Sequence, residues 1–438
     1  MATLGQAGWY AFAGARIVRG RSRKRHAGRR RRVSSPVSNP GGHALALSIP
    51  ERLDDLTPEW LTAALRESGE LASTATVTSS EQEILGEGEG FLGDIVRLRL
   101  GYEGGEGPAT VIAKMPKLAN RAMGELLGAY ERESCFYDEM AGDLPLETPR
   151  MYYGDFDRDM ASERQEAALK LADRTPRLLT GLMTRLGLWV SGRKNRRYIL
   201  LLEDIGDAEP GDQLTGVSPE RCATVLAAIA RMHAAYWESE ALENRFWLVP
   251  LSIDARIRNG LFKDSQPTFR EKFAHLVDDS FDRALSWAAA NGEEGVRRLY
   301  RESPTTLLHC DPRLDNVAFR DGEPIVFDWQ LVRRGPAAYD VAYFLSGACA
   351  DLTGDDEAEL LRGYFAVLGE QGVRGYSFEA LVRDYHLGLL TAMQTLTATD
   401  VMDMGEGRGV QLMAAWYERL AARAAGINFD RLLAAPVA

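Results

Sequence analysis

The chain has 438 residues, of which 45% are hydrophobic and 26% are charged. This composition is that of an ordinary globular protein, and the length is enough for two or three domains. The sequence contains no apolar run of about 18 residues, which excludes a helical membrane span. The four cysteines show no CxxC pairing and no zinc-like spacing with histidine. We therefore expect reduced thiols in a cytoplasmic protein.

The charge is unevenly distributed along the chain. Residues 1–50 hold ten of the 52 Lys and Arg residues and none of the 63 Asp and Glu residues. A segment this basic cannot bury a core, so we predict a disordered tail over residues 1–48. The alternatives are a nucleic-acid arm, a transit peptide or an extension from a misassigned start. The acidic remainder of the chain argues against nucleic acid as the main partner.

The first half of the chain has a mixed pattern. A helix is predicted over residues 57–69, because Thr57 suits the N-cap and Pro58 suits the first helical position. Apolar runs predict strands, and one longer segment has helical periodicity. The strands are expected within residues 83–100, 110–116, 150–156 and 198–206, and the helix within 121–141. We interpret residues 160–195 as a mainly helical insertion in a β-rich lobe over residues 49–204.

From about residue 218 the pattern changes to long helices. Helices are predicted over residues 219–237 and 270–292, and a short β segment is predicted over 317–327. The whole pattern indicates an α+β fold, with a mainly helical second lobe over residues 205–438. Two lobes of this kind would leave a cleft between them.

The stretch LLHCDPRLDNVAFRDGEPIVFDWQ, residues 307–330, carries the strongest chemical signal. The triplets VAF and IVF flank Asp321-Gly322, a dipeptide typical of a two-residue hairpin turn. Asn316 and Asp328 are each six residues from Gly322, so a hairpin centred there would place them at roughly opposing positions. An amide oxygen and a carboxylate at that spacing suit Mg²⁺, which keeps several sites for water and phosphate.

Asp311 lies on the loop that enters this predicted hairpin. A carboxylate beside a metal-bound phosphate can orient a hydroxyl group and accept its proton during phosphoryl transfer. His309 would brace the same loop. The alternative is a polar loop without catalytic function, and any one of these residues alone would favour it. The combined H-x-D-x-x-x-x-N spacing, followed by an Asp at a strand end, favours the catalytic interpretation.

The motifs HCDPRLDN, FDWQ and GPAAYD, which lie between residues 309 and 340, together resemble a known family. They are similar to the catalytic region of the aminoglycoside phosphotransferase/choline kinase-like superfamily. The DWQ form is nearest to the ecdysteroid-kinase-like branch. The resemblance runs from about Glu83 to Tyr343. It implies a bilobal protein-kinase-like fold and phosphorylation of small-molecule hydroxyl groups with ATP and Mg²⁺.

The resemblance also implies roles for individual residues. Asp311 corresponds to the catalytic Asp, and Asn316 and Asp328 correspond to the metal ligands. Asp340 corresponds to the Asp that braces the catalytic loop from the next helix. One position departs from the family pattern: Cys310 stands where the family usually has Gly. This difference puts the loop geometry and full activity in doubt, and it raises the question of oxidation.

The first lobe contains candidates for the nucleotide site. A kinase needs a strand lysine that contacts ATP phosphates and a helix carboxylate that holds this lysine. Lys114 at the end of TVIAKMP fits the first requirement. Glu133 in ERESCFY fits the second, and Glu131 is the neighbouring alternative.

The segment GEGEGFLG lies between two predicted strands and lacks the GK[ST] of a Walker A loop, which disfavours a P-loop NTPase. Backbone amides of Gly88, Gly90 and Gly93 would face the ATP phosphates, and an ordinary glycine-rich turn is the alternative. The stretch YILLLEDIG resembles the hinge strand of kinases. The backbone of Glu203 and Ile205 would then meet the adenine, unless these residues form a plain strand end.

We therefore predict an ATP-dependent kinase that phosphorylates the hydroxyl group of an unidentified small molecule. The alternatives are an aminoglycoside-type antibiotic phosphotransferase and a catalytically impaired nucleotide-binding protein. A protein kinase is disfavoured, because GPAAYD follows DWQ without a long activation segment. The acceptor site is expected within residues 380–420. The sequence indicates neither the acceptor nor the oligomeric state.

Overall fold

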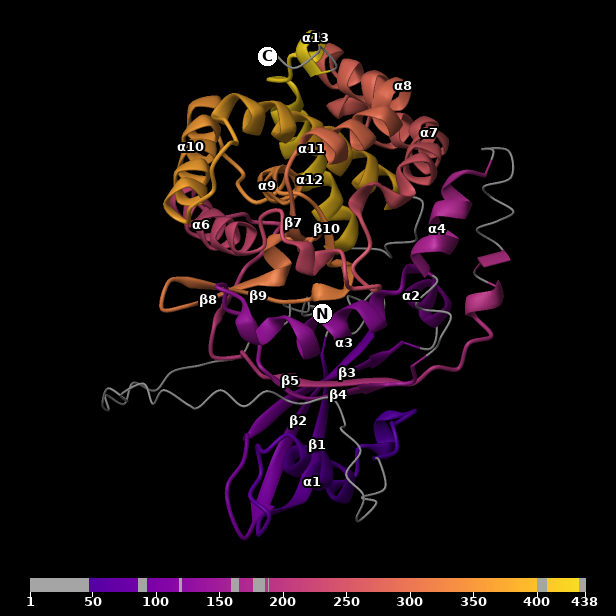
Figure 1. Ribbon diagram of the computed structural model, residues 1–438, viewed down its shortest axis with the longest axis vertical. Coiled ribbons are helices and arrows are strands. Elements are labelled where there is room, and N and C mark those ends of the chain that lie inside the picture. Colours follow the sequence, from indigo (N-terminus) through magenta and orange to yellow (C-terminus); the bar gives the residue numbers. More distant parts are fainter. Residues whose placement is uncertain are drawn as a thin grey trace, which may run out of the picture.

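The computed structural model describes residues 47–85, 93–117, 120–158, 165–175, 186–187, 189–399 and 408–432. A β-rich part and a mainly helical part lie one above the other along the long axis of the molecule (Figure 1). The predicted α+β architecture, with a β-rich lobe followed by a helical lobe as in protein kinases, is confirmed. No helix in the described ranges is long and apolar enough to cross a membrane.

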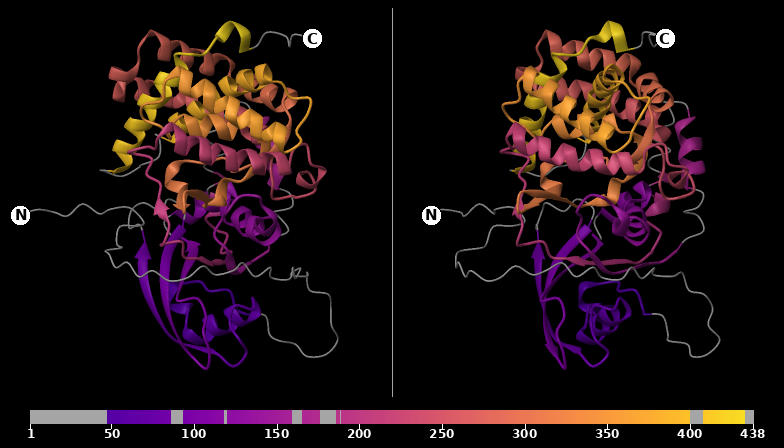
Figure 2. Two further views of the ribbon diagram at one scale, coloured as in Figure 1. Left: turned by 90° about the vertical axis from the view of Figure 1, so that its left-hand side faces the viewer. Right: turned by 60° about the vertical axis from the view of Figure 1, so that its left-hand side comes forward.

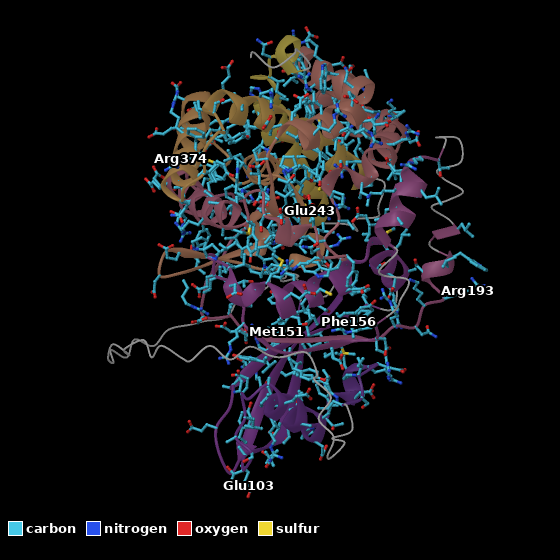
Figure 3. The ribbon with its side chains drawn as sticks, in the orientation of Figure 1. Glu103, Met151, Phe156, Arg193, Glu243 and Arg374 are labelled. Atoms are coloured by element: carbon cyan, nitrogen blue, oxygen red, sulfur yellow. The ribbon has the colours of Figure 1, made fainter. Side chains whose placement is uncertain are left out.

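The β-rich part is built on one antiparallel sheet with the strand order β1-β2-β3-β5-β4. Its strands are β1 (Thr76–Leu85), β2 (Gly93–Glu103), β3 (Thr110–Pro116), β4 (Met151–Phe156) and β5 (Tyr198–Glu203). Its helices are α1 (Pro58–Glu67), α2 (Arg121–Leu127) and α3 (Ala129–Glu139). Helix α4 (Gln165–Asp173) precedes β5 in the chain but packs against α7 (Ala255–Lys272) of the helical part. Figure 3 labels Met151 and Phe156 at the two ends of β4, and Glu103 at the far end of β2.

The helix predicted after Thr57 is confirmed. The Thr57 side chain caps α1 by accepting a hydrogen bond from the Trp60 N–H at 3.3 Å, and Pro58 is the first helical residue. Gly128 divides the helical segment predicted over residues 121–141 into α2 and α3. Its φ of 67° is a left-handed conformation that glycine adopts without strain.

The strand β5, which lies between β3 and β4, is buried on both faces. Ile199 and Leu201 belong to an outer core that α1 covers. Leu200 and Leu202 point the other way, into a core that they share with Phe136 of α3 and with the helical part. Because neighbouring strand residues face opposite sides of a sheet, one strand serves both cores.

The mainly helical part also contains two small β units, which lie in the half of it that faces the β-rich part (Figure 1 and Figure 2). The pair β7 (Thr305–Leu308) and β10 (Arg333–Pro336) is antiparallel, and β8 (Val317–Arg320) lies between β6 (Glu209–Pro210) and β9 (Glu323–Val326). The helices are α6 (Pro219–Ala235), α7 (Ala255–Lys272), α8 (Asp279–Glu302), α9 (Ala338–Leu345), α10 (Gly354–Glu370), α11 (Phe378–Thr399), α12 (Arg408–Ala424) and α13 (Phe429–Leu432).

The single helix predicted over residues 270–292 is wrong. Helix α7 ends at Lys272, and a short 3-10 turn (Ala274–Leu276) separates it from α8. Asp278 causes the new start, because its carboxylate accepts hydrogen bonds from the N–H groups of Ser280 and Phe281 at 2.9 and 2.8 Å. A side-chain cap of this kind satisfies N–H groups that a continuous helix would bond internally.

Candidate active site

The hairpin of β8 and β9 places the predicted metal ligands. Asp321 and Gly322 form its two-residue turn, and both have positive φ values of 53° and 86°, as a type I′ turn requires. The centre of the hairpin therefore lies between these two residues and not at Gly322. The expected pairing of Asn316 with Asp328 is off by one position. The backbone carbonyl of Asn316 accepts a hydrogen bond from the Phe327 N–H at 3.0 Å, so Asn316 lies opposite Phe327. The two predicted ligands still lie at the same open end of the hairpin.

Lys114 connects the two parts of the molecule. It lies on β3, and its Nζ is 2.6 Å from Oε1 of Glu133 on α3 and 2.9 Å from Oδ1 of Asp328 after β9. The structure thus brings together the predicted lysine, its predicted helix carboxylate and one predicted metal ligand. The neighbouring alternative Glu131 points elsewhere and binds Arg196 at 2.9 Å.

Burial and neighbouring charges set the pKa values of Lys114, Asp328 and Glu133. Burial alone would lower the pKa of Lys114, but the charges of Asp328 and Glu133 outweigh it and raise that pKa. Burial would raise the pKa of Asp328, but the Lys114 charge keeps it below its usual value. Burial dominates at Glu133, whose pKa is raised although Lys114 opposes the shift. Lys114 and Asp328 are therefore both charged at neutral pH.

Residues after Asp328 fix its position. Asp328 has a φ of 66°, a left-handed conformation that turns its side chain out of the strand. Its Oδ2 accepts a hydrogen bond from Nε2 of Gln330 at 3.0 Å. The Trp329 ring is fully buried and stacks on Phe136 of α3 with 4.0 Å between ring centroids. This stacking holds the helix that carries Glu133 against the segment that carries Asp328.

Asp340 of α9 braces the predicted catalytic loop. Its two carboxylate oxygens accept hydrogen bonds from the N–H groups of His309 and Cys310 at 2.7 and 2.9 Å. Cys310 has a φ of 68°. This is the left-handed region that glycine adopts without strain, so Cys310 takes the backbone conformation that a glycine would take here. The Asp340 carboxylate supports this conformation by accepting from the two N–H groups that lie on either side of the His309 Cα.

Asp311 follows directly and is held in place by its neighbours. His309 Nδ1 accepts a hydrogen bond from the Asp311 N–H at 3.2 Å, so His309 Nε2 donates to the Phe327 carbonyl at 2.9 Å. The amide group of Asn316 donates to the Asp311 carbonyl at 2.9 Å and to its Oδ2 at 3.1 Å. The predicted catalytic residue and the first predicted metal ligand are therefore in direct contact, and His309 braces the loop as expected.

The surroundings of Asp311 change its acidity. Burial raises the pKa of the Asp311 carboxyl group, and the nearby Asp328 charge raises it further. Arg313 and His309 oppose this shift, and the Tyr343 hydroxyl group also lowers the pKa. The net direction is upward from the ordinary value of 3.8. Such a carboxylate is a better proton acceptor than an exposed aspartate.

The donor set at the hairpin fits Mg²⁺. The Asn316 amide nitrogen is used by Asp311, and its amide oxygen accepts no hydrogen bond from the described residues. Asp328 supplies a charged carboxylate at the same end of the hairpin. No group of three or more His, Cys, Asp or Glu side chains in the described ranges could enclose a metal ion. Two oxygen ligands and no protein cage suit a cation that keeps water and phosphate ligands.

The structure describes only some of the other residues that were predicted to bind the nucleotide. Gly88 and Gly90 lie outside the described residues. Gly93 is the first residue of β2 and is paired with β3, and a Cβ atom there would lie 3.1 Å from the Met115 carbonyl oxygen. Glu203 ends β5. The Ile205 carbonyl accepts a hydrogen bond from the Ala208 N–H at 2.9 Å, and among the described residues the Ile205 N–H donates to no group.

Several supporting residues carry no catalytic, metal-binding or nucleotide-binding assignment from the sequence. His233 of α6 is fully buried. Its Nε2 lies 3.4 Å from Oδ2 of Asp340, and its Nδ1 forms a hydrogen bond with the Tyr364 hydroxyl group at 2.7 Å. The sequence indicates a packing or supporting role for His233, but not its partners. Trp329 and Gln330 belong to the quoted DWQ motif. This motif was the sequence signal that could have indicated their contacts with α3 and Asp328.

Comparison with known proteins finds a family model that matches part of this chain. Residues 189–378 match the model of the phosphotransferase enzyme family, which confirms the resemblance for this region. The ecdysteroid-kinase-like branch is not specifically identified. No curated protein gives a significant match.

Two solved structures are among those similar to this chain. A putative aminoglycoside phosphotransferase from Ralstonia eutropha is 14% identical, with a TM-score of 0.41, and the match covers 83% of this chain and 97% of that chain. A choline kinase from Cryptosporidium parvum is 11% identical, with a TM-score of 0.45, and the match covers 83% of this chain and 92% of that chain.

Proposed function

We propose that this chain, whose residues 189–378 match the phosphotransferase enzyme family, is an ATP-dependent small-molecule kinase. It transfers the γ-phosphoryl group of ATP to a hydroxyl group of its acceptor. The observation that carries the proposal is the position of Lys114 between Glu133 and Asp328. A charged lysine held by one carboxylate and placed beside a second is suited to bind phosphates next to a metal ion.

The residues of the second part support the chemical step. Asp311 lies next to Asn316 and has a raised pKa, so it is suited to orient a hydroxyl group and to accept its proton. Asn316 and Asp328 would hold Mg²⁺, which supplies charge neutralisation of the phosphates when it is bound. Most of the catalysis would then come from positioning and from fixed charges.

The adenine would bind at the end of β5. The Ile205 N–H is suited to donate to the base, since no described group accepts from it, and Glu203 lies at the strand end beside it. Gly93 would bring the backbone of β2 close to the phosphates. Gly88 and Gly90 complete the proposed glycine loop.

The test compares two variants in ATP titration and in an ATP-consumption screen over sugars, amino alcohols, sterols and aminoglycosides. Lys114→Ala removes a charge-assisted contact, so we expect ATP affinity or the transfer rate to fall by about tenfold or more. Asp311→Asn keeps the shape of the side chain and leaves ATP affinity nearly unchanged. It removes the proton acceptor, so the transfer rate should fall by roughly 10² or more.

The outcomes separate the proposed kinase from a protein that only binds nucleotide. If Asp311→Asn weakens ATP binding as strongly as Lys114→Ala, then Asp311 belongs to the nucleotide site and the proposed roles are wrong. If the wild type binds ATP but phosphorylates no acceptor, the impaired-enzyme alternative is favoured. Cys310→Gly is then the variant to test for recovered transfer, because glycine adopts the left-handed conformation at this position without strain.

A further inference from the structure

Three arginine side chains gather beside the catalytic loop with too few partners. Arg258 of α7 and Arg333 of β10 share one carboxylate, since their Nη2 atoms lie 2.5 and 2.9 Å from the two oxygens of Asp254. Arg132 of α3 is 1% exposed, and its only hydrogen bond to a described residue goes from Nη2 to the Leu127 carbonyl at 2.7 Å. The cluster therefore contains three guanidinium groups and one directly bound carboxylate.

The fold brings these arginines together from three separate segments. Arg132 and Phe136 are four residues apart and share one face of α3. Phe136 stacks on Trp329, and the chain continues from there into β10, which begins at Arg333. Burial lowers the pKa of Arg132 to about 9, and the charge of Arg333 contributes to the shift. The two guanidinium groups therefore repel each other at close range.

Nitrogen atoms of all three side chains remain buried without a hydrogen-bond acceptor among the described residues. These atoms are Nε and Nη1 of Arg132, Nη1 of Arg258 and Nη1 of Arg333. Glu131, whose charge also acts on Arg132, already binds Arg196. A buried charge without a partner is strongly destabilising, and buried N–H groups are almost always paired. The missing partner should be an oxyanion, because carboxylate and phosphate oxygens suit guanidinium donors best.

The cluster lies close to the proposed catalytic residue. Arg333 pairs with Leu308 across the β7–β10 ladder, and Leu308 precedes Asp311 by three residues. At ~3.3 Å per extended residue and ~5 Å between paired strand residues, the backbones of Arg333 and Asp311 are within roughly 15 Å of each other. This distance is within the length of one small molecule. The side chains of Arg258 and Arg333 retain 10% and 13% exposure, so solvent reaches this end of the cluster.

We infer that Arg132, Arg258 and Arg333 form a binding site for an oxyanion, and that the phosphoryl acceptor carries this group. The acceptor is then an alcohol that also bears a carboxylate or a phosphate ester. The part of the inference that concerns the acceptor rests on the proposed function, whereas anion binding does not. A cationic acceptor such as an aminoglycoside or an amino alcohol is disfavoured by three neighbouring guanidinium groups.

Anion binding is tested with inorganic phosphate as the probe, by calorimetry and by thermal unfolding against chloride at matched ionic strength. Phosphate should bind and raise the melting temperature of the wild type. Binding should weaken by about tenfold or more in Arg333→Gln and in Arg132→Met. Arg132→Met breaks no ion pair and removes an uncompensated buried charge, so its melting temperature in chloride should not fall. This variant keeps the test valid if Arg333→Gln does not fold.

Lys114→Ala is the matched control, because phosphate could also bind at the proposed nucleotide site. Phosphate binding that persists in Lys114→Ala and is lost in the arginine variants supports the inference. Binding that is lost in Lys114→Ala and kept in the arginine variants places the anion at the nucleotide site and overturns it. An absence of phosphate binding to the wild type also overturns it.

The acceptor class is tested with pairs of hydroxy acids and their methyl esters in the ATP-consumption assay. The wild type should prefer the acid by about tenfold or more, and Arg132→Met should lose this preference. Equal or faster turnover of the esters or of amino alcohols overturns the acceptor class and leaves the proposed function intact. If phosphate binds at the arginines but no alcohol is phosphorylated, the proposed function and the acceptor class fail together, while the anion site stands.

Discussion

At the scale of single residues, the proposed site depends on carboxylates whose surroundings differ. Asp328 is charged because Lys114 lies 2.9 Å away. Asp311 has a raised pKa because burial outweighs the cations around it. The sequence predicted the identity of both residues from their spacing. It did not predict the direction of either shift, because burial and the Lys114 contact depend on how the two parts of the chain pack.

The pH dependence of transfer provides a test of the Asp311 assignment. The carboxyl group must be deprotonated to accept a proton, so kcat/KM should fall as the pH drops through the raised pKa of Asp311. Arg313 Nε lies 3.7 Å from Asp311 Oδ2 and lowers this pKa. Arg313→Gln should therefore raise the pKa and move the acid limb of the kcat/KM profile to higher pH. An acid limb that stays in place would argue against Asp311 as the proton acceptor. Arg301→Gln, on the exposed surface of α8, is the matched control.

Cys310 is a second residue for which the structure changes an expectation from the sequence, here the reactivity of its thiol. The sequence raised the question of oxidation, but Cys310 is 6% exposed and burial raises its pKa. Only the thiolate reacts readily, so the folded protein should keep this thiol inert near neutral pH. We expect iodoacetamide to modify Cys310 slowly in the native protein and rapidly after unfolding in urea, as measured by mass spectrometry. Equally fast modification in both states would show that the loop opens.

At the scale of elements, the hairpin of β8 and β9 was predictable because its signals are local. The dipeptide Asp321-Gly322 and the flanking apolar triplets are sufficient to predict two strands and their turn. The predicted register was off by one position, because the hairpin was centred on Gly322 and not between the two turn residues. The β7–β10 pair and the helix start at Asp278 were missed. The β7–β10 pair depends on contacts between two segments that are far apart in the chain. The cap at Asp278 is local, but the helical pattern on both sides of it favoured one continuous helix.

The turn provides a stability test for this element. Gly322 has a φ of 86°, and no atom lies within 4 Å of the position that an added Cβ would take. Alanine would therefore meet backbone strain without a steric clash. We expect Gly322→Ala to cost about 1–2 kcal/mol of unfolding free energy. The transfer rate should fall with it, because the turn sets the positions of Asn316 and Asp328.

The control for this variant is Gly142→Ala. Gly142 also has no atom within 4 Å of an added Cβ, and its φ lies outside the left-handed region. Thermal unfolding of both variants measures the difference. Equal melting temperatures for Gly322→Ala and the wild type would mean that the turn can relax into a register without the strained conformation.

At the scale of the whole molecule, the two parts are less separate than the sequence suggests. The predicted boundary between residues 204 and 205 follows the change from strands to helices. The larger core nevertheless crosses this boundary, because Phe136, Leu200 and Leu202 pack with residues of the helical part. The arginine cluster likewise draws on both parts. Such juxtapositions have no signature in the sequence, since their members come from segments far apart in the chain.

This shared core predicts that the first part does not fold alone. A fragment of residues 47–204 would expose one face of β5 and the α3 side chains that pack on the helical part. Burial of a large apolar side chain contributes about 1.5–3 kcal/mol, and a domain has only about 5–15 kcal/mol of net stability. We therefore expect the fragment to show no sharp thermal transition by circular dichroism. Co-expression with residues 205–438 should restore one cooperative transition. A fragment that unfolds cooperatively by itself, near the melting temperature of the whole chain, would show that the outer core under α1 is sufficient for folding.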